Sequence, residues 1–528
     1  MAEGAKLLMK HISANNKIFV PIDSDCDGFT SAALFINYLN RLFPHWAQTN
    51  IIYKAHQGKE HGIIESAVPA DVKLVVAIDS SSNDYEVHEN LSKKGIEVLV
   101  LDHHEADKIS EYACVINNQL CDYPNKFLSG VGIAYQFCRY LDSLLGTNHA
   151  EHYEDLVALG LTADMMDLRE FETMYLIKKG LMKINNPYFS EMVKRNYVKF
   201  ENGVTPFTVA FYVAPFINAI NRTGSYQDKI LLFESLLDFK AYQMIPSTKK
   251  GCKGQFETLV EQAGRTSINV KNAQKRNRDA GRDIIEKIIK DKNLLDNKIL
   301  IIPIPEGLVD KNLSGLIANE LASEYQRPVL ILREVVNEGV KSWEGSARSY
   351  GINNFKDLLA ESGLVMYAQG HQGAFGVGIL DILLNSFISW TNEALKDISF
   401  DVKYNVDFIY DAKLINGTDI LELAEYADIW GQNIDEPLVV IKNIKLNKDN
   451  LRFIGNGKTL RIDLPKDKIS LIKFNIDEDE KELLTPNENG VLEIEVVGTC
   501  QKNVWMGYTS PQIAIKDYDI VKRVEYYF

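Results

Sequence analysis

The stretch IFVPIDSDCDG, residues 18–28, is a short apolar run that ends in a cluster of three aspartates. Two later stretches have the same form, LVVAID at 74–79 and VLVLD at 98–102. Near-continuous hydrophobic runs of this length are typical of strands buried on both faces of a parallel sheet. Ligands of such sheets bind beyond the carboxyl ends of the strands. The sequence therefore predicts an α/β fold in which Asp23, Asp79 and Asp102 gather at one edge.

Side chains that bind metals are concentrated at this predicted edge. His103 and His104 directly follow the third run, and Asp164 ends the segment ALGLTAD at 158–164. Carboxylates that converge in a partly buried site cannot all stay ionised unless a cation compensates their charge. Carboxylates with one or two imidazoles suit Mn²⁺, Mg²⁺ or Zn²⁺, and bridging carboxylates suit a pair of ions. An Asp-rich turn at a helix N-cap would explain one such stretch, but three acid-terminated runs with a His–His pair favour a metal site.

Four motifs, in this order, resemble those of the DHH phosphoesterase family: DSDCDG at 23–28, VVAIDSS at 75–81, LDHHEAD at 101–107 and GLTADMMDL at 160–168. PFINAINR at 215–222 is similar to the segment that closes the catalytic core in the RecJ-type branch. GSARS at 345–349 and GHQGAFG at 370–376 resemble two signatures of the accompanying DHHA1 domain. The resemblance runs from about residue 15 to about residue 385, and more faintly to the C-terminus.

This resemblance implies two divalent metal ions, with Mn²⁺ expected and Mg²⁺ as the alternative. Asp79 would bridge the ions, and Asp23 would complete the shell of one ion or support it from behind. The expected ligands are Asp23, Asp25, Asp27, Asp79, His103 and Asp164.

The resemblance also implies roles in catalysis and substrate binding. Asp79 belongs to the catalytic set as the bridging ligand. His104 would orient the scissile phosphate or assist proton transfer, and Asp102 would fix an imidazole. Arginine can hold a phosphate through two hydrogen bonds, and small neighbours let the backbone come close. The expected substrate-binding residues of the motif segments are Arg348, Ser346, His371, Gly370, Asn218 and Arg222.

The expected function is a metal-dependent exonuclease that hydrolyses single-stranded DNA from the 5′ end, with a metal-activated water as nucleophile. One alternative is the same chemistry on oligoribonucleotides or cyclic dinucleotides. The other is a catalytically inactive replication scaffold, which the complete ligand set argues against. Single-stranded DNA is the expected partner, together with a single-strand-binding protein or a helicase, and we expect a monomer.

The predicted organisation is a parallel-sheet DHH catalytic domain at 1–245, a connecting helix at 246–293, a second α/β domain of the DHHA1 type at 294–395, and an OB-fold-like β-barrel at 396–528. The barrel is predicted from five or six short strands with turn signals after about residue 400. Exposed aromatic side chains there could stack on the bases of a single strand, and Trp505 is the main candidate, with Phe474, Tyr508 and Lys473 beside it.

Elsewhere the sequence predicts a helix from Phe29 through Phe43 that Pro44 ends, with Asp25 and Asp27 in the turn before it. It also predicts a polar helix from about 254 to 291 and a Gly-rich loop at 370–378.

Composition limits the classes of protein to consider. The net charge of −14 argues against a protein that coats nucleic acid by bulk electrostatics. A locally basic stretch at 249–292 either tracks a DNA backbone or forms a solvated helix face. Six cysteines without metal-type spacing, no apolar stretch of membrane-spanning length and no signal-peptide pattern predict a cytoplasmic protein.

Overall fold

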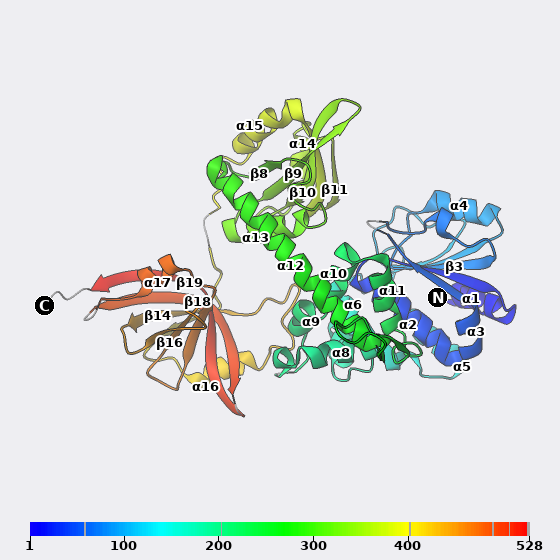
Figure 1. Ribbon diagram of the computed structural model, residues 1–528, viewed down its shortest axis with the longest axis horizontal. Helices are drawn as coiled ribbons and strands as arrows, with labels where there is room; N and C mark the ends of the chain where they lie inside the picture. The colour runs from blue at the N-terminus through cyan, green and yellow to red at the C-terminus, as the bar shows by residue number, and fades with distance from the viewer. Residues whose placement is uncertain (58–59, 202, 401–402, 488–489, 506, 525–528) are drawn as a thin grey trace. The chain divides into compact units, whose positions relative to one another are not determined.

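The structure is a computed structural model, and its described residues are 1–57, 60–201, 203–400, 403–487, 490–505 and 507–524. The chain divides into two compact units, Met1–Ser267 with Tyr404–Phe528, and Ile268–Lys403. Helix α12 (Leu259–Asp291) begins in the first unit and continues into the second (Figure 1). The four-domain division expected from the sequence stays a prediction.

A parallel sheet of five strands forms the first part of the chain, in the order β2-β1-β3-β4-β5. The three acid-terminated runs form its centre as β1 (Lys17–Ile22), β3 (Val72–Ile78) and β4 (Glu97–Asp102), and nearly all their residues are buried. The shorter strands β2 (Ile51–Ala55) and β5 (Cys114–Asn117) form the edges. This arrangement confirms the predicted α/β sheet and places the acids that end these runs at one edge.

Helices cover both faces of this sheet, which is why its central strands are apolar throughout. Leu99 of β4 faces α1 (Ala2–Ser13) and α5 (Gly130–Leu145), where Gly4 and Phe137 lie close to it. The neighbouring Val98 and Val100 face the other side and pack in one cluster with Leu91 of α4 (Tyr85–Lys93). Successive strand residues point to opposite faces, so the two packing layers follow from one strand sequence.

Helix α2 (Cys26–Leu42) follows β1, and Pro44 opens α3 (Pro44–Asn50), as the sequence predicts. The helix begins at Cys26, three residues before the expected Phe29. Asp25 is its N-cap and accepts a hydrogen bond from the Gly28 N–H, so Asp27 lies in the first helical turn rather than in a turn before the helix. The remaining helices of this part are α6 (Glu154–Ala163), α7 (Phe171–Leu181), α8 (Pro187–Arg195), α9 (Pro206–Tyr212), α10 (Ala214–Thr223) and α11 (Tyr226–Ser235), with 3₁₀ turns η1 (Glu65–Ala67), η2 (Ala150–Tyr153) and η3 (Tyr197–Phe200).

The long polar helix starts later than the predicted residue 254. Residues Phe256–Thr258 form strand β7, which pairs with β6 (Met244–Pro246). Thr258 and Glu261 then form a reciprocal capping box, because the Thr258 hydroxyl accepts from the Glu261 N–H while the Glu261 carboxylate accepts from the Thr258 N–H. This pair satisfies backbone donors at the helix start, so α12 begins at Leu259.

The second unit contains a five-stranded sheet in the order β11-β12-β10-β9-β8, in which β8 and β9 are parallel and the other pairs antiparallel. Its strands are β8 (Leu300–Ile304), β9 (Val329–Asn337), β10 (Val340–Arg348), β11 (Tyr367–His371) and β12 (Ala374–Leu380). Helices α12 and α13 (Ser314–Tyr325) contribute to one hydrophobic cluster, while α14 (Phe355–Glu361) and α15 (Leu384–Ala394) contribute to another. The turns η4 (Leu294–Asp296) and η5 (Asp381–Leu383) complete the unit.

The loop predicted at 370–378 in this unit was wrong. The Gly-rich stretch at 370–378 is not a loop but the hairpin of β11 and β12. Gly373 lies in the turn of this hairpin, whereas Gly378 is crowded: a Cβ there would overlap the ring of Tyr367 on the paired strand.

The described residues between 404 and 524 form a seven-stranded sheet in the order β13-β14-β18-β19-β17-β16-β15 around one hydrophobic core. The strands are β13 (Phe408–Asp411), β14 (Leu438–Leu446), β15 (Leu451–Ile454), β16 (Thr459–Asp463), β17 (Ser470–Phe474), β18 (Val491–Trp505) and β19 (Tyr508–Val524), with α16 (Gly417–Ala424) and α17 (Glu478–Leu484). The sequence predicted five or six strands and missed β15 and β19. The buried residues of β19, Pro511, Ile513 and Ile515, form only a short alternation, and charged residues follow from Lys516 onward. Among the described residues of the whole chain, no helix has the length and apolarity needed to cross a membrane.

Candidate metal centre and substrate-binding residues

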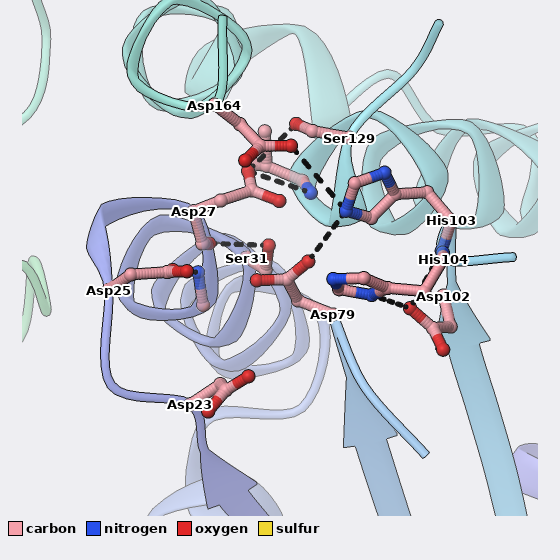
Figure 2. Close-up of polar contacts among 12 residues, drawn as sticks. Asp23, Asp25, Asp27, Ser31, Asp79, Asp102, His103, His104, Ser129 and Asp164 are labelled. Atoms are coloured by element: carbon pink, nitrogen blue, oxygen red, sulfur yellow. Dashed lines mark hydrogen bonds and ion pairs between the residues drawn. The ribbon is translucent and has the colours of Figure 1, made fainter. Parts of the chain in front are cut away.

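Asp27, Asp79, His103 and Asp164 meet at the carboxyl edge of the parallel sheet (Figure 2). His103 Nε2 lies 3.1 Å from Asp79 Oδ1 and 3.5 Å from Asp164 Oδ2. Ligand atoms of Asp27, His103 and Asp164 all lie within 4.8 Å of one another, and so do those of Asp79, His103 and His104. The structure thus brings four of the six predicted metal ligands into two overlapping groups that share His103.

These side chains fit a divalent cation, because their negative charge is poorly compensated. Burial raises the pKa of Asp79 well above its usual range, and the carboxylates of Asp27, Asp25 and Asp164 raise it further. Burial and nearby carboxylates also raise the pKa of Asp164, and that of Asp25 to about 6. The Asp27 Oδ2 atom is buried without a hydrogen-bond partner. Oxygen and imidazole ligands of this kind suit Mn²⁺, Mg²⁺ or Zn²⁺.

The backbone holds Asp79 in an uncommon conformation. Its φ angle is +64°, a left-handed value that aspartate tolerates better than most residues. The Asp79 N–H donates to the Leu101 carbonyl at 2.8 Å, which ties this residue to the end of β4. A Cβ at Gly130, the first residue of α5, would overlap the Asp79 side chain. The side chain of Asp79 is therefore fixed from two sides before any metal binds.

Asp27 is oriented by α5 and α6. Its Oδ1 accepts from the Ser129 hydroxyl at 2.8 Å and from the Val131 N–H at 3.3 Å (Figure 2), while Oδ2 has no hydrogen-bond partner. A Cβ at Gly160 would overlap Asp27 Oδ1, so only glycine allows this close approach of α6. These contacts leave one oxygen of Asp27 for a cation.

The other two predicted ligands lie outside these groups. Asp25 points to the Gly28 N–H at 2.9 Å as the N-cap of α2. Asp23 Oδ1 lies 3.1 Å from His56 Nδ1, and Asp23 Oδ2 contacts His61 Nδ1. Burial would raise the pKa of Asp23, but its hydrogen bonds with the two histidines outweigh burial and lower the pKa to about 2. Metal binding by Asp23 and Asp25 stays a prediction.

His56 and His61 are site residues that the sequence reasoning missed. His56 directly follows β2, so it lies at the same carboxyl edge as the acids, and it is buried. The His61 ring lies 5.5 Å from the His104 ring in an edge-on arrangement. Lys229 of α11 donates to the His56 carbonyl at 2.9 Å, which anchors this segment. The position of His56 after a strand was the available signal, but Tyr53 and Lys54 interrupt the apolar run of that strand.

Asp102 and His104 form a hydrogen-bonded pair beside the metal ligands. His104 Nδ1 lies 2.8 Å from Asp102 Oδ1, and Figure 2 shows the other ring nitrogen directed toward Asp79. Burial would lower the pKa of His104, but the hydrogen bond to Asp102 and the surrounding carboxylates raise it to about 9. Asp102 therefore fixes an imidazole, as the sequence predicts, and the imidazole is that of His104.

The predicted substrate-binding residues of the second unit also lie together. Arg348 of β10 and His371 of β11 both pair with Ala374 of the strand between them, and Gly370 precedes His371 with a φ angle of +129°. The Ser346 and Ser314 hydroxyls lie 3.0 Å apart. The Arg348 guanidinium packs against Gly315 at the start of α13 and donates to the Ala347 carbonyl at 2.7 Å. A guanidinium beside a helix N-terminus suits an anion such as phosphate.

Asn218 and Arg222 lie four residues apart on α10, hence on one face of this helix. Burial lowers the pKa of Arg222, while the charge of Asp25 opposes that change, so Arg222 lies near the acidic loop. Trp505 ends β18, but its side chain lies outside the described part of the chain. Phe474 and Tyr508 are exposed, whereas Lys473 pairs with Glu480 at 2.7 Å.

Part of the basic stretch at 249–292 is neutralised by acids. Arg278 lies 2.8 Å from Glu320 and Arg282 lies 2.8 Å from Glu286. Arg265 pairs with Glu257. These ion pairs favour a salt-bridged helix over a surface that tracks a DNA backbone.

Comparisons with known proteins agree with this architecture. The model of the DHH family, N-terminal domain, matches residues 17–161, and that of the RecJ OB domain matches residues 406–517. YorK of the SPbeta prophage in Bacillus subtilis strain 168, provisionally named a single-strand DNA-specific exonuclease, is 37% identical over 529 residues, covering 98% of this chain and 90% of YorK. The single-stranded-DNA-specific exonuclease RecJ of the same organism is 24% identical, covering 98% of this chain and 63% of RecJ.

Solved structures show the same fold. RecJ of Thermus thermophilus in complex with Mn²⁺ matches with a TM-score of 0.74 and 20% identity, covering 99% of this chain and 72% of that one. The structure of that protein in complex with Mg²⁺ gives a TM-score of 0.69 at 20% identity, covering 99% and 70%. A likeness at this level of identity shows the fold alone.

Proposed function

The chain belongs to the RecJ-type branch of the DHH family, and from this premise we propose that it is a metal-dependent exonuclease that hydrolyses single-stranded DNA from the 5′ end. The convergence of Asp27, Asp79, His103 and Asp164 carries the proposal. Buried acids with raised pKa values need a cation, and a phosphodiester is the substrate class that such cations activate. The choice of DNA rests on the names of YorK and RecJ.

We propose two divalent ions, Mn²⁺ by preference, held by Asp27, Asp79, His103 and Asp164 with Asp79 bridging. Carboxylates on two sides of His103 support this proposal, with Asp79 at 3.1 Å and Asp164 at 3.5 Å from its Nε2 and Asp27 grouped with Asp164. When bound, a pair of ions lowers the pKa of a water and stabilises the attacking and leaving oxygens. Asp25 and Asp23 would join after side-chain rotation, since Asp25 is the N-cap of the helix that carries Asp27 and Asp23 follows β1 at the same sheet edge.

The residues around the ligands position the substrate. Asp102 accepts a hydrogen bond from His104 Nδ1, which leaves Nε2 to donate to an oxygen of the scissile phosphate. Arg222, near the acidic loop, and Asn218 on the same helix face would bind a neighbouring phosphate or sugar. Arg348, Ser346, His371 and Gly370 would bind a further phosphate with the second unit. A helicase or a single-strand-binding protein would then supply the unpaired strand.

The proposal is tested by digestion of 5′- and 3′-labelled single strands, duplex DNA, RNA and a cyclic dinucleotide in Mn²⁺. We expect release of mononucleotides from the 5′ end of the DNA single strand and little cleavage of the duplex. Faster turnover of RNA or of the dinucleotide would replace the DNA assignment with the alternative of a small-substrate phosphodiesterase. No hydrolysis of any substrate, by folded protein that binds Mn²⁺, would overturn the enzymatic function.

A further inference from the structure

A cavity of about 300 Å³ opens beside the metal ligands, within the first compact unit. The end of α6, the residues that follow it, helix α9 and the segment 430–436 line this cavity. The lining residues used below are Thr162, Met165, Phe207, Phe211 and Trp430. A main-chain hydrogen bond links the residues after α6 to the segment 430–436, because the Leu168 N–H donates to the Gln432 carbonyl at 3.1 Å.

Aromatic surface is exposed inside this cavity. The rings of Phe207 and Phe211 lie 4.5 Å apart, and these residues are 54% and 59% exposed. Trp430 contributes a third aromatic ring to the lining. Aromatic side chains on which bases stack are the common device for holding a single strand without sequence preference.

Two features of the wall point to a ligand. The Thr162 hydroxyl is buried without a hydrogen-bond partner, and the residue is only 9% exposed. Buried polar atoms normally have partners, so a bound group with polar edges would satisfy this one. Met165 has a left-handed φ angle of +53° and is 63% exposed. Such backbone conformations are unfavourable for a large side chain and are concentrated at functional sites.

Two residues that line the cavity are close in sequence to a metal ligand. Thr162 and Met165 flank Asp164, whose carboxylate lies 3.5 Å from His103 Nε2. Two acids, Asp435 and Glu436, also line the cavity and disfavour a phosphate inside it. A neutral, flat group with polar edges is the part of a nucleotide that suits these walls.

We propose that this cavity is a nucleobase subsite that takes one unstacked base of the strand whose phosphate lies at the metal centre. The inference rests on the proposed function and adds a source of strand selectivity to it. A base must leave its stack and its pairing partner to enter the cavity, so a duplex end has to open first. Stacking on Phe207 and Phe211 accepts any base, because every base has a π-face.

The test is a coupling experiment with Phe207→Ala, Phe211→Ala and the matched control Phe256→Ala, an exposed phenylalanine of β7. Each protein digests a single strand in Mn²⁺ that carries one abasic residue, placed at each position in turn from the cleaved end. We expect the Phe207 and Phe211 variants to lose about 5- to 150-fold in kcat/KM on the intact strand, from the usual strength of base stacking. At one position the abasic residue should lower kcat/KM of the wild type by a similar factor. At that position it should not lower kcat/KM of the two variants any further.

The coupling is a ratio within each protein, so it does not depend on how much of a variant is folded. Variants with wild-type rates, or losses that multiply at every abasic position, would overturn the base subsite while leaving the nuclease function intact. The same coupling in Phe256→Ala would also overturn it. A wild-type protein that cleaves no strand would instead show that the proposed function has failed, and the subsite with it.

Discussion

Replacing Asp79 by asparagine tests the metal centre with little change of shape. Asparagine has the same size and tolerates the φ angle of +64°, so the contact with Gly130 is preserved. Alanine would add backbone strain at this left-handed position. The substitution removes one negative charge from a side chain that is only 2% exposed and faces His103 Nε2 at 3.1 Å.

The two expected effects have opposite signs. Metal ions contribute several kcal/mol to a phosphoryl-transfer transition state, so the loss of a bridging ligand should lower kcat by about 10²- to 10⁴-fold. Without metal, the neutral side chain removes repulsion with Asp27 and Asp164, which raises the unfolding free energy by about 1–2 kcal/mol near neutral pH. The variant should therefore be less active and, in EDTA, more stable than the wild type.

The assay combines hydrolysis of a 5′-labelled single strand in Mn²⁺ with thermal melting in EDTA and in Mn²⁺. Asp71→Asn serves as the matched control, since Asp71 forms an exposed ion pair with Lys17. Mn²⁺ should raise the melting temperature of the wild type and of the control more than that of Asp79→Asn. Near-wild-type turnover, or an equal response of all three proteins to Mn²⁺, would refute the assignment of Asp79 as a ligand.

Four further outcomes are expected. Excess EDTA should abolish hydrolysis and Mn²⁺ should restore it; activity that persists in EDTA would exclude the metal mechanism. Arg348→Ala should raise KM by about 10- to 100-fold through loss of a charge-assisted phosphate contact, with unchanged metal content; loss of bound metal would mean that Arg348 acts elsewhere. Tyr508→Ala, at an 81% exposed position, should weaken binding of long strands by about 5- to 150-fold but leave very short ones unaffected, and equal losses would argue against stacking there. Asp142 accepts hydrogen bonds from Tyr38 and Thr147, which outweigh burial and lower the pKa of this carboxyl, so its contribution to stability is present above about pH 4 and is lost as the pH falls further. Asp142→Asn should therefore lower the free energy of unfolding by about 1–3 kcal/mol near pH 7 in chemical denaturation, and a difference that persists at about pH 2 would contradict this.

The parallel sheet could be predicted because burial on both faces leaves a direct record in the sequence. Residues 18–22, 74–78 and 98–101 are apolar without interruption, and the acids after them lie where the topology of a parallel sheet requires. The order of the motifs then placed Asp27, His103 and Asp164 in one site. Contacts between residues far apart in the sequence were thus predictable where the residues directly follow strands of the parallel sheet.

Side-chain direction and edge strands were not predictable in the same way. Asp23 comes only four residues before Asp27, yet Asp23 bonds to His56 and His61, which come from the segment after β2. That strand is at the sheet edge and carries Tyr53 and Lys54, so no apolar run announces it. Strand β19 was missed for a related reason, because partly exposed charged residues from Lys516 onward interrupt its apolar pattern.

The metal centre also depends on three residues that would not bind an ion, Gly28, Gly130 and Gly160. A single methyl group at each position would enter the space of Asp23, Asp79 and Asp27 respectively. In a genetic screen for loss of function, alanine at any of these glycines should therefore be recovered alongside substitutions of the acids themselves. Inactivating mutations of this centre can therefore occur at more positions than there are metal ligands.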